Sequence, residues 1–111
     1  MFYKQNKNGY LTLAEGVGQK TLVYGEKSSL SEFVVDAGSL IPQHSHPHEQ
    51  SGYLVRGHLR FSATGEIQDV YPGDAWCFPG GVEHGAEVIE DSVVVEVFTP
   101  VREEYLPKKD R

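Results

Sequence analysis

The sequence contains one cysteine, Cys77, among 111 residues, so the chain cannot form an internal disulfide. It has no run that approaches the roughly 20 apolar residues of a membrane-spanning helix. Residues 1–10 lack the apolar segment of a secretory signal. A lone cysteine suits a reducing compartment. These absences argue against a disulfide-stabilised secreted domain and a helical membrane protein, and they predict a cytoplasmic protein with no membrane partner.

Long stretches without glycine or proline are also missing. The longest one covers residues 86–99, only 14 residues, and it is rich in β-branched side chains. Such side chains disfavour a helix and favour a strand. The 12 glycines and 6 prolines are spread evenly along the chain. This pattern excludes a helical bundle, a coiled coil and a doubly wound α/β domain, and the 11% aromatic content excludes disorder.

Positive charge is scarce. Ten Lys and Arg residues stand against 16 Asp and Glu residues, which gives a formal net charge of −6. The basic residues are scattered, apart from Lys108, Lys109 and Arg111 near the C-terminus. Binding to a polyanion needs clustered positive charge. The sequence therefore predicts no nucleic-acid partner.

Short strand-like segments separated by turn signals fill most of the chain. We expect nine strands, at residues 10–14, 20–24, 30–36, 50–56, 58–64, 67–71, 75–78, 84–89 and 92–99. Many short strands with short loops are typical of an all-β sandwich or barrel. A chain of this length suits one domain. We therefore assign residues 1–111 to a single domain, with a barrel core at about 10–100 and a C-terminal tail at 101–111.

Three of the five histidines lie within five residues, namely His44, His46 and His48. Residues two apart in an extended chain share a face, so His44 and His46 would project both imidazoles to one side, and Gln50 has the same parity. A His-x-His pair with a third histidine nearby favours a metal site over a structural role. His58, which follows a glycine in a hairpin, is expected to be a surface or hydrogen-bonded residue.

The residues around these histidines resemble the two motifs of the cupin superfamily. The first motif is represented by Gly38, His44, His46, Gln50 and Gly57, and the second, 15 residues further on, by Gly73, Pro79, Gly81 and His84. The sequence departs from the family pattern at Gln50, where glutamate is usual, and at Val88, where asparagine is usual. The resemblance implies a jelly-roll β-barrel, or double-stranded β-helix, with a metal ion in its mouth.

Carried over by position, the resemblance implies one divalent transition metal ion (Ni, Zn, Mn, Fe or Co) held by His44, His46, Gln50 and His84. Imidazole and amide donors are neutral, so the ion would keep its full charge and favour an anionic ligand. Glu49 is an alternative ligand to Gln50, but it has the opposite strand parity. We expect His48 to face outward and Cys77 to be a small buried residue.

The segment from Val95 to Leu106 narrows the resemblance. Together with the first motif, it resembles the pectin-degradation, KdgF-like cupins, which convert 4,5-unsaturated monouronates into linear keto-sugars. In that group an acidic residue, an aromatic residue and an arginine line the site, and the matching positions here are Glu96, Phe98 and Arg102. The group has aspartate where this chain has Glu96.

The resemblance assigns a role to each of these residues. Glu96, which we expect to point inward, would move a proton, and Arg102 would grip the substrate carboxylate, so both would be catalytic. Phe98 and Tyr53 would wall the sugar ring and, with Arg102, bind the substrate.

Three functions remain open at this point. The first is a metal-dependent enzyme that opens or isomerises unsaturated uronates, with a small anionic sugar as its partner. The second is another metal-dependent cupin enzyme, either a dioxygenase or a sugar isomerase. The third is a non-catalytic module that senses or binds a small ligand. The resemblance also implies a homodimer, because small cupins commonly pair through their sheets.

Overall fold

The computed structural model describes residues 1–106, which form eight strands and one short 3-10 helix, and no α-helix occurs in this range. The elements are β1 (Leu11–Ala14), β2 (Val17–Tyr24), β3 (Ser29–Val35), β4 (Leu40–His44), β5 (Glu49–Ala63), β6 (Glu66–Val70), β7 (Ala75–Phe78), β8 (His84–Thr99) and η1 (Glu103–Tyr105). All strand pairs are antiparallel. The predicted all-β jelly roll is confirmed.

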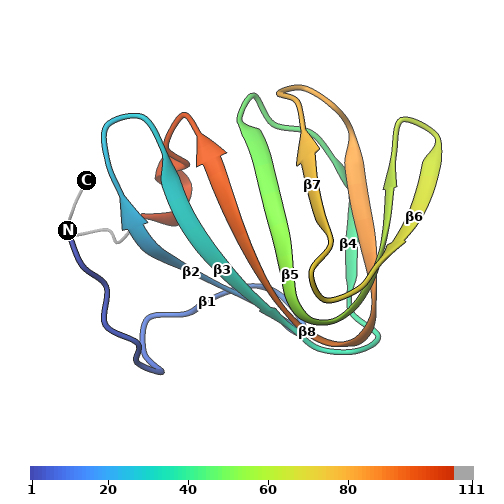
Figure 1. Ribbon diagram of the computed structural model, residues 1–111, viewed down its shortest axis with the longest axis horizontal. Helices are drawn as coiled ribbons and strands as arrows, with labels where there is room; N and C mark the ends of the chain where they lie inside the picture. Colours follow the sequence, from blue (N-terminus) through green and yellow to red (C-terminus); the bar gives the residue numbers. More distant parts are fainter. Residues whose placement is uncertain (107–111) are drawn as a thin grey trace.

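The two long strands, β5 and β8, pair with different neighbours along their two halves. The first half of β5 pairs with β7, and its second half pairs with β6. The first half of β8 pairs with β4, and its second half pairs with β3. One continuous sheet therefore folds into two layers, which β5 and β8 join (Figure 1).

The strand count differs from the prediction for a local reason. Residues 50–56 and 58–64 belong to one strand, β5, and residues 84–89 and 92–99 belong to one strand, β8. The turn signals at Gly57 and at Glu90-Asp91 mark bends inside these strands. The strand β4 was not predicted, because Pro42 and neighbouring polar residues interrupt its pattern. As an edge strand that pairs with β8 alone, β4 tolerates the proline.

The bends of the two long strands meet at Gly57 and Ser92. Gly57 has φ of +105°, and a Cβ atom there would lie 2.0 Å from the Ser92 Oγ atom. The Ser92 hydroxyl donates to the Glu90 carbonyl at 2.7 Å and accepts from the His58 backbone N–H at 3.0 Å. A glycine is therefore required where β5 crosses from one layer to the other.

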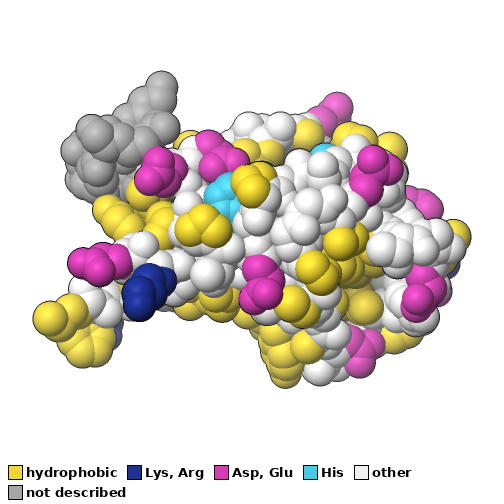
Figure 2. Space-filling view, turned by 90° about the horizontal axis from the view of Figure 1, so that it is seen from above, with side chains coloured by type: hydrophobic (Ala, Val, Ile, Leu, Met, Phe, Trp, Pro, Cys, Tyr) yellow, Lys and Arg dark blue, Asp and Glu magenta, His cyan; other side chains and the backbone are white. Residues whose placement is uncertain are grey.

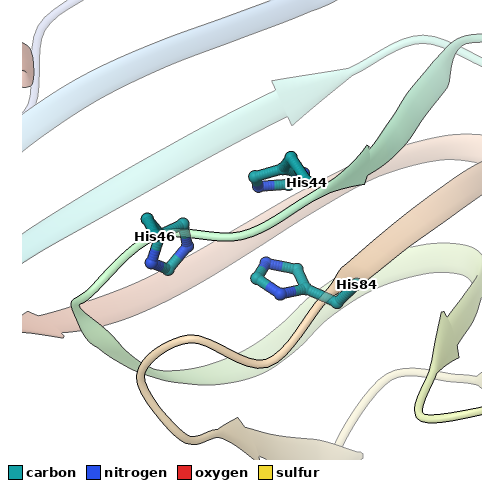
Figure 3. Close-up of side chains that lie close together, drawn as sticks. All are labelled: His44, His46 and His84. Atoms are coloured by element: carbon teal, nitrogen blue, oxygen red, sulfur yellow. The ribbon is translucent and has the colours of Figure 1, made fainter.

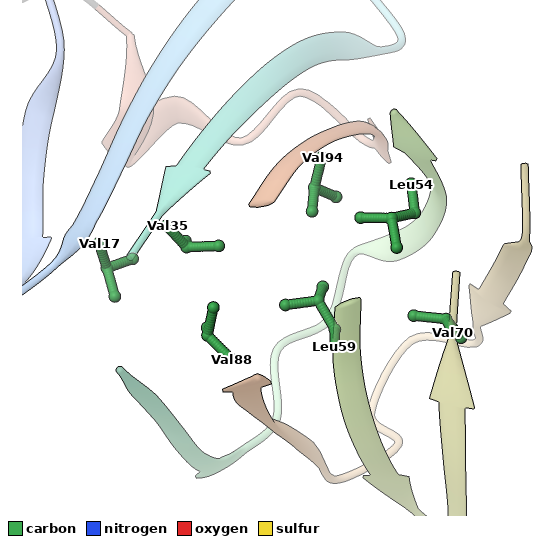
Figure 4. Close-up of a cluster of buried hydrophobic side chains, with 7 residues drawn as sticks. All are labelled: Val17, Val35, Leu54, Leu59, Val70, Val88 and Val94. Atoms are coloured by element: carbon green, nitrogen blue, oxygen red, sulfur yellow. The ribbon is translucent and has the colours of Figure 1, made fainter. Parts of the chain in front are cut away.

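The hydrophobic core lies between the two layers (Figure 4). It consists of Val17, Val35, Leu54, Leu59, Val70, Val88 and Val94, all buried. These residues come from five of the eight strands, so the core holds both layers together through apolar burial. Phe33, Ile41, Phe61 and Trp76 are partly buried and pack against this core.

The chain beyond β8 returns toward the barrel. Tyr105 in η1 packs edge-on against Phe33 and Phe98, with ring centroids 6.2 and 6.0 Å away. Leu106 is buried. The basic cluster of residues 108–111 lies outside the described residues. Across residues 1–106, none of the helical segments has the length and apolar character needed to cross a membrane.

Candidate metal centre and cavity

Three histidines from separate segments converge at one end of the barrel. His44 ends β4, His46 lies in the loop after it, and His84 begins β8 directly opposite His44 in the strand register. Their ligand nitrogens lie within 4.8 Å of one another, and Figure 3 shows the three rings grouped together. The β4–β8 pairing thus brings His84 to a pair of histidines about 40 residues earlier in the chain.

Backbone carbonyls set the orientation of each imidazole. The Nδ1 atoms of the three histidines lie 3.0, 3.0 and 2.9 Å from the carbonyl oxygens of Pro42, His48 and Val82. A carbonyl only accepts, so each Nδ1 carries the hydrogen and each Nε2 keeps its lone pair. Second-shell hydrogen bonds of this kind orient histidine ligands in metal sites.

The Nε2 atoms are short of partners among residues 1–106. The Nε2 of His84 is buried and has no hydrogen-bond partner there. The Nε2 of His46 lies 2.8 Å from the Gln50 Oε1 atom. The Gln50 Nε2 donates to the Glu96 Oε2 at 2.5 Å, which fixes the amide with its oxygen toward His46. Two electron-pair donors therefore face each other, and a bound cation would satisfy both.

Burial favours the neutral forms of His46 and His84. The pKa of His84 is lowered chiefly by burial, and the pKa of His46 is lowered by burial and then by the positive charge of Arg102. A neutral imidazole is the form that binds a metal ion. The His84 Nε2 is buried without a partner, and the lone pairs of the His46 Nε2 and the Gln50 Oε1 face each other. Such nitrogen and oxygen donors fit a divalent first-row ion.

A cavity of about 200 Å³ opens beside the histidines. Its polar lining comprises His44, Gln50, His84, Glu96 and Arg102, and Phe33, Phe61, Phe98 and Tyr105 form most of its aromatic wall. This volume is below the roughly 300–1,000 Å³ of sites for drug-sized ligands. The cavity therefore suits a molecule no larger than a monosaccharide.

Glu96 points into the barrel, with only 6% of its surface exposed. Its Oε2 atom accepts hydrogen bonds from the Gln50 amide at 2.5 Å and from the Trp76 indole N–H at 3.0 Å. The Oε1 atom has no hydrogen bond from residues 1–106. Burial raises the pKa of this carboxyl, against the two hydrogen bonds and the Arg102 charge. Glu96 is thus a carboxyl group with one oxygen held and one available.

Arg102 enters the cavity between two aromatic rings. Its guanidinium carbon lies 4.9 Å from the Phe98 ring centroid and 4.3 Å from that of Tyr105. Its Nε atom donates to the Glu104 carboxylate at 3.0 Å. Stacking and one ion pair fix the plane of the guanidinium, and the two terminal nitrogens have no hydrogen bond from residues 1–106, so they can meet an anion.

The surface carries mostly negative charge. Figure 2 shows acidic side chains scattered over one face of the molecule, where Lys and Arg are sparse. Arg102 is therefore a positive group inside an otherwise acidic protein with a net charge of −6. An anion that binds in the cavity is therefore attracted by Arg102 and not by the charge of the protein surface.

The sequence of the chain matches the cupin domain family over residues 31–99. The chain belongs to this family. Among solved structures it resembles KdgF from Halomonas sp., with 29% sequence identity, a TM-score of 0.90, and coverage of 96% of this chain and 100% of that one. No curated protein matches the chain in sequence.

Two more distant structures share the cupin fold. An RmlC-like cupin from Shewanella frigidimarina is 24% identical, with a TM-score of 0.88 and coverage of 95% of each chain. The polyketide cyclase RemF from Streptomyces resistomycificus is also 24% identical, with a TM-score of 0.68, and the match covers 78% of this chain and 66% of the RemF chain. These likenesses concern the fold alone.

Most residues singled out in the sequence of this cupin lie where the motifs place them. His44, His84, Gln50, Glu96, Phe98 and Arg102 line one cavity, and His46 adjoins it through Gln50. Glu49 is exposed, as its parity indicates. His58 bonds Asp69 at 2.9 Å outside the site, as expected.

Three expectations are wrong. Tyr53 is 48% exposed and does not line the cavity, because it alternates with the inward Gly52 and Leu54 on β5. Cys77 is exposed, since its neighbours Trp76 and Phe78 take the inner face of β7. His48 does not face outward: its ring lies 5.5 Å from His46 and 6.4 Å from Phe98, and its Nδ1 is buried.

No role was assigned to Gly52 or to Trp76 from the sequence. Both are required at the Glu96 carboxylate, because the indole crosses Gly52 to reach it. Strand parity alone could have placed Trp76 opposite Cys77. The contact with Glu96 depends on the register of β7, β5 and β8, which cannot be predicted from a local sequence pattern.

Proposed function

We propose that this cupin is a metal-dependent enzyme that opens the ring of a 4,5-unsaturated monouronate and isomerises it to a linear keto-sugar. One observation carries the proposal: a cluster of three histidines adjoins a single small cavity that the Glu96 carboxyl and the Arg102 guanidinium also line. The likeness to KdgF, at 29% identity over 96% of the chain, supports it.

The ligands of the ion would be His44, His46, Gln50 and His84. Imidazole and amide ligands carry no charge when they bind, and the Nδ1 contacts leave the three Nε2 atoms and the Gln50 Oε1 as the donor atoms. Such an ion supplies Lewis-acid polarisation of a substrate oxygen. Because no ligand is anionic, the site should hold a negatively charged substrate better than a site with glutamate at this position.

Arg102 would bind the substrate carboxylate through its terminal nitrogens. A guanidinium offers paired donors that match the two oxygens of a carboxylate. Phe98 is fully buried under the guanidinium and lines the cavity, so it would lie against the sugar ring.

Glu96 would carry the proton through its free Oε1. In ring opening, the anomeric hydroxyl loses its proton, the C1=O bond forms and the bond from C1 to the ring oxygen breaks. That oxygen takes up a proton and becomes an enol on C5. A proton then leaves the enol and one is added at C4, which yields the ketone. The reaction is an isomerisation and needs no oxidant. A carboxyl whose pKa is raised by burial suits both transfers.

The test combines metal analysis with an absorbance assay on an unsaturated uronate. We expect the protein to contain about one divalent ion per chain and to remove the absorbance of the conjugated C4=C5 bond. A chelator and His84→Ala should each abolish this activity. His58→Ala is the matched control, because His58 lies outside the site, and it should retain activity.

Two outcomes would contradict the proposal. If the protein is loaded with metal but leaves the uronate unchanged, ring opening is not its activity. If it holds iron and consumes oxygen instead, the dioxygenase alternative replaces it.

We also propose that two copies associate through the outer face of the sheet. Four apolar side chains there are more than a third exposed, namely Val34, Tyr53, Val55 and Val97. Covering them would remove apolar surface from water. Sedimentation velocity checks this, and a species at the mass of one 12.4 kDa chain would contradict it.

A further inference from the structure

A row of three residues crosses the inner face of the sheet next to the histidines. Glu96 of β8 pairs with Gly52 of β5, and Gly52 pairs with Trp76 of β7. Glu96 and Trp76 thus stand on the two strands that flank β5, with a glycine between them. Two strand spacings separate their backbones, about 9–10 Å, so only a long side chain can bridge them.

The indole of Trp76 fills the space over Gly52. A Cβ atom on Gly52 would lie 2.3 Å from the indole ring atoms Nε1 and Cε2. The indole also packs against Phe61, with ring centroids 4.7 Å apart. In this position its N–H reaches the Glu96 Oε2 atom at 3.0 Å. Any side chain at residue 52 would exclude the indole from the carboxylate.

The same carboxylate oxygen holds the Gln50 amide. A glutamine amide has two orientations that differ by a half turn, and only one presents its oxygen to His46. Glu96 selects the orientation with the Gln50 oxygen toward His46. An ionised carboxylate can accept a hydrogen bond from the amide nitrogen but cannot donate one to the amide oxygen. In the opposite orientation the NH₂ group would face the His46 Nε2 and obstruct a cation.

We propose that Trp76 is a positioning residue for the metal centre: its N–H and ring fix the Glu96 carboxylate, which holds the Gln50 oxygen toward the ion. The inference rests on the proposed function in that it requires the metal centre. Trp76 touches no histidine among the contacts of residues 1–106, so its effect reaches the ion through Glu96 and Gln50.

The first test is the Zn²⁺ affinity of Trp76→Phe, measured by competition with a chromophoric chelator. Phenylalanine keeps an aromatic ring over Gly52 and removes the N–H. Outer-shell substitutions typically weaken metal binding by roughly 10–100-fold, and we expect about tenfold here because two residues intervene. Tyr53→Phe is the matched control: it also removes one polar hydrogen from an aromatic residue beside Gly52, but on the outer face. Its affinity should equal that of the unaltered protein.

The second test uses the unaltered protein. Trp76 is the sole tryptophan, so its indole N–H gives one NMR resonance. We expect this resonance to move when Zn²⁺ is added and to stay in place when Zn²⁺ is added to His84→Ala. This readout does not depend on the folding of a Trp76 variant.

The outcomes separate the two proposals. If the unaltered protein binds Zn²⁺ while Trp76→Phe, folded by circular dichroism, binds it equally well, the positioning role is wrong and the metal centre stands. If the Trp76 indole resonance does not move when Zn²⁺ binds, the positioning role is also wrong. If the unaltered protein binds no divalent ion, the metal centre itself is wrong, and the positioning role falls with it.

Discussion

Gln50 shows how a single residue can serve two neighbours at once. Its amide oxygen faces the His46 Nε2 at 2.8 Å, and its amide nitrogen donates to Glu96 at 2.5 Å. A glutamate at this position would place a second carboxylate against Glu96, and two buried like charges are costly. Glutamine at position 50, where cupins usually have glutamate, therefore avoids a repulsion between two buried carboxylates at Glu96.

Glu96→Gln tests proton transfer by this residue. The new amide oxygen can still accept from Gln50 and Trp76, but the side chain no longer exchanges a proton at the cavity. Turnover of metal-loaded protein should fall by roughly 10²–10⁴-fold. Turnover and metal content are measured on the same samples.

The control for this substitution lies on the same strand. Glu87→Gln removes one exposed carboxylate from β8 and should leave turnover unchanged. If Glu96→Gln retains full turnover, Glu96 moves no proton and only orients Gln50.

At the scale of elements, the bends of β5 and β8 place the site. Each strand serves both layers, so His84 at the start of β8 and Glu96 near its end face the same cavity. Gly57 allows this crossing, because the Ser92 side chain and the Asp91 carbonyl occupy the space where a Cβ would be.

Gly57→Ala should destabilise the fold by about 2 kcal/mol or more, since it combines an unfavourable positive φ with steric overlap. Gly65→Ala is the matched control, because Gly65 also has a positive φ, +77°, but nothing lies within 4 Å of its Cβ position. Its cost should be about 1–2 kcal/mol from the backbone alone.

Urea unfolding of both variants measures the difference. Equal losses of stability would show that the β5–β8 contact at Gly57 relaxes freely, contrary to this interpretation.

The elements were predictable to the extent that their signals are local. The strand segments 75–78 and 67–71 nearly coincide with β7 and β6, because alternation and turn residues mark them. The strand β4 was missed and the bends of β5 and β8 were taken for turns. A glycine with positive φ occurs in both a hairpin and a strand bend, and only the partner strand distinguishes them.

At the scale of the whole molecule, the candidate ligands tie separate parts of the chain together. They come from β4, the following loop, β5 and β8, which lie up to 40 residues apart, His44 to His84. An ion bound only by the folded state would therefore stabilise the entire barrel.

Divalent metal should raise the melting temperature. At a free concentration 100-fold above Kd, binding contributes about 2.7 kcal/mol. For a domain of this size that corresponds to roughly 10 °C. Thermal unfolding with metal and with chelator measures this change in melting temperature. His84→Ala should have almost the same melting temperature under both conditions. An equal shift in that variant would indicate binding elsewhere.

The sequence by itself determined the family, the all-β fold and most of the candidate site, because the cupin motifs lie at characteristic intervals along the chain. The candidate ligands His44, His46, Gln50 and His84 follow from the resemblance to those motifs. Only the tertiary structure decided that Tyr53 lies outside the cavity, that Arg102 stacks between Phe98 and Tyr105, and that Trp76 reaches Glu96 over Gly52. Each of these depends on the register between strands distant in sequence, and a side-chain contact across strands exists only once that register is set.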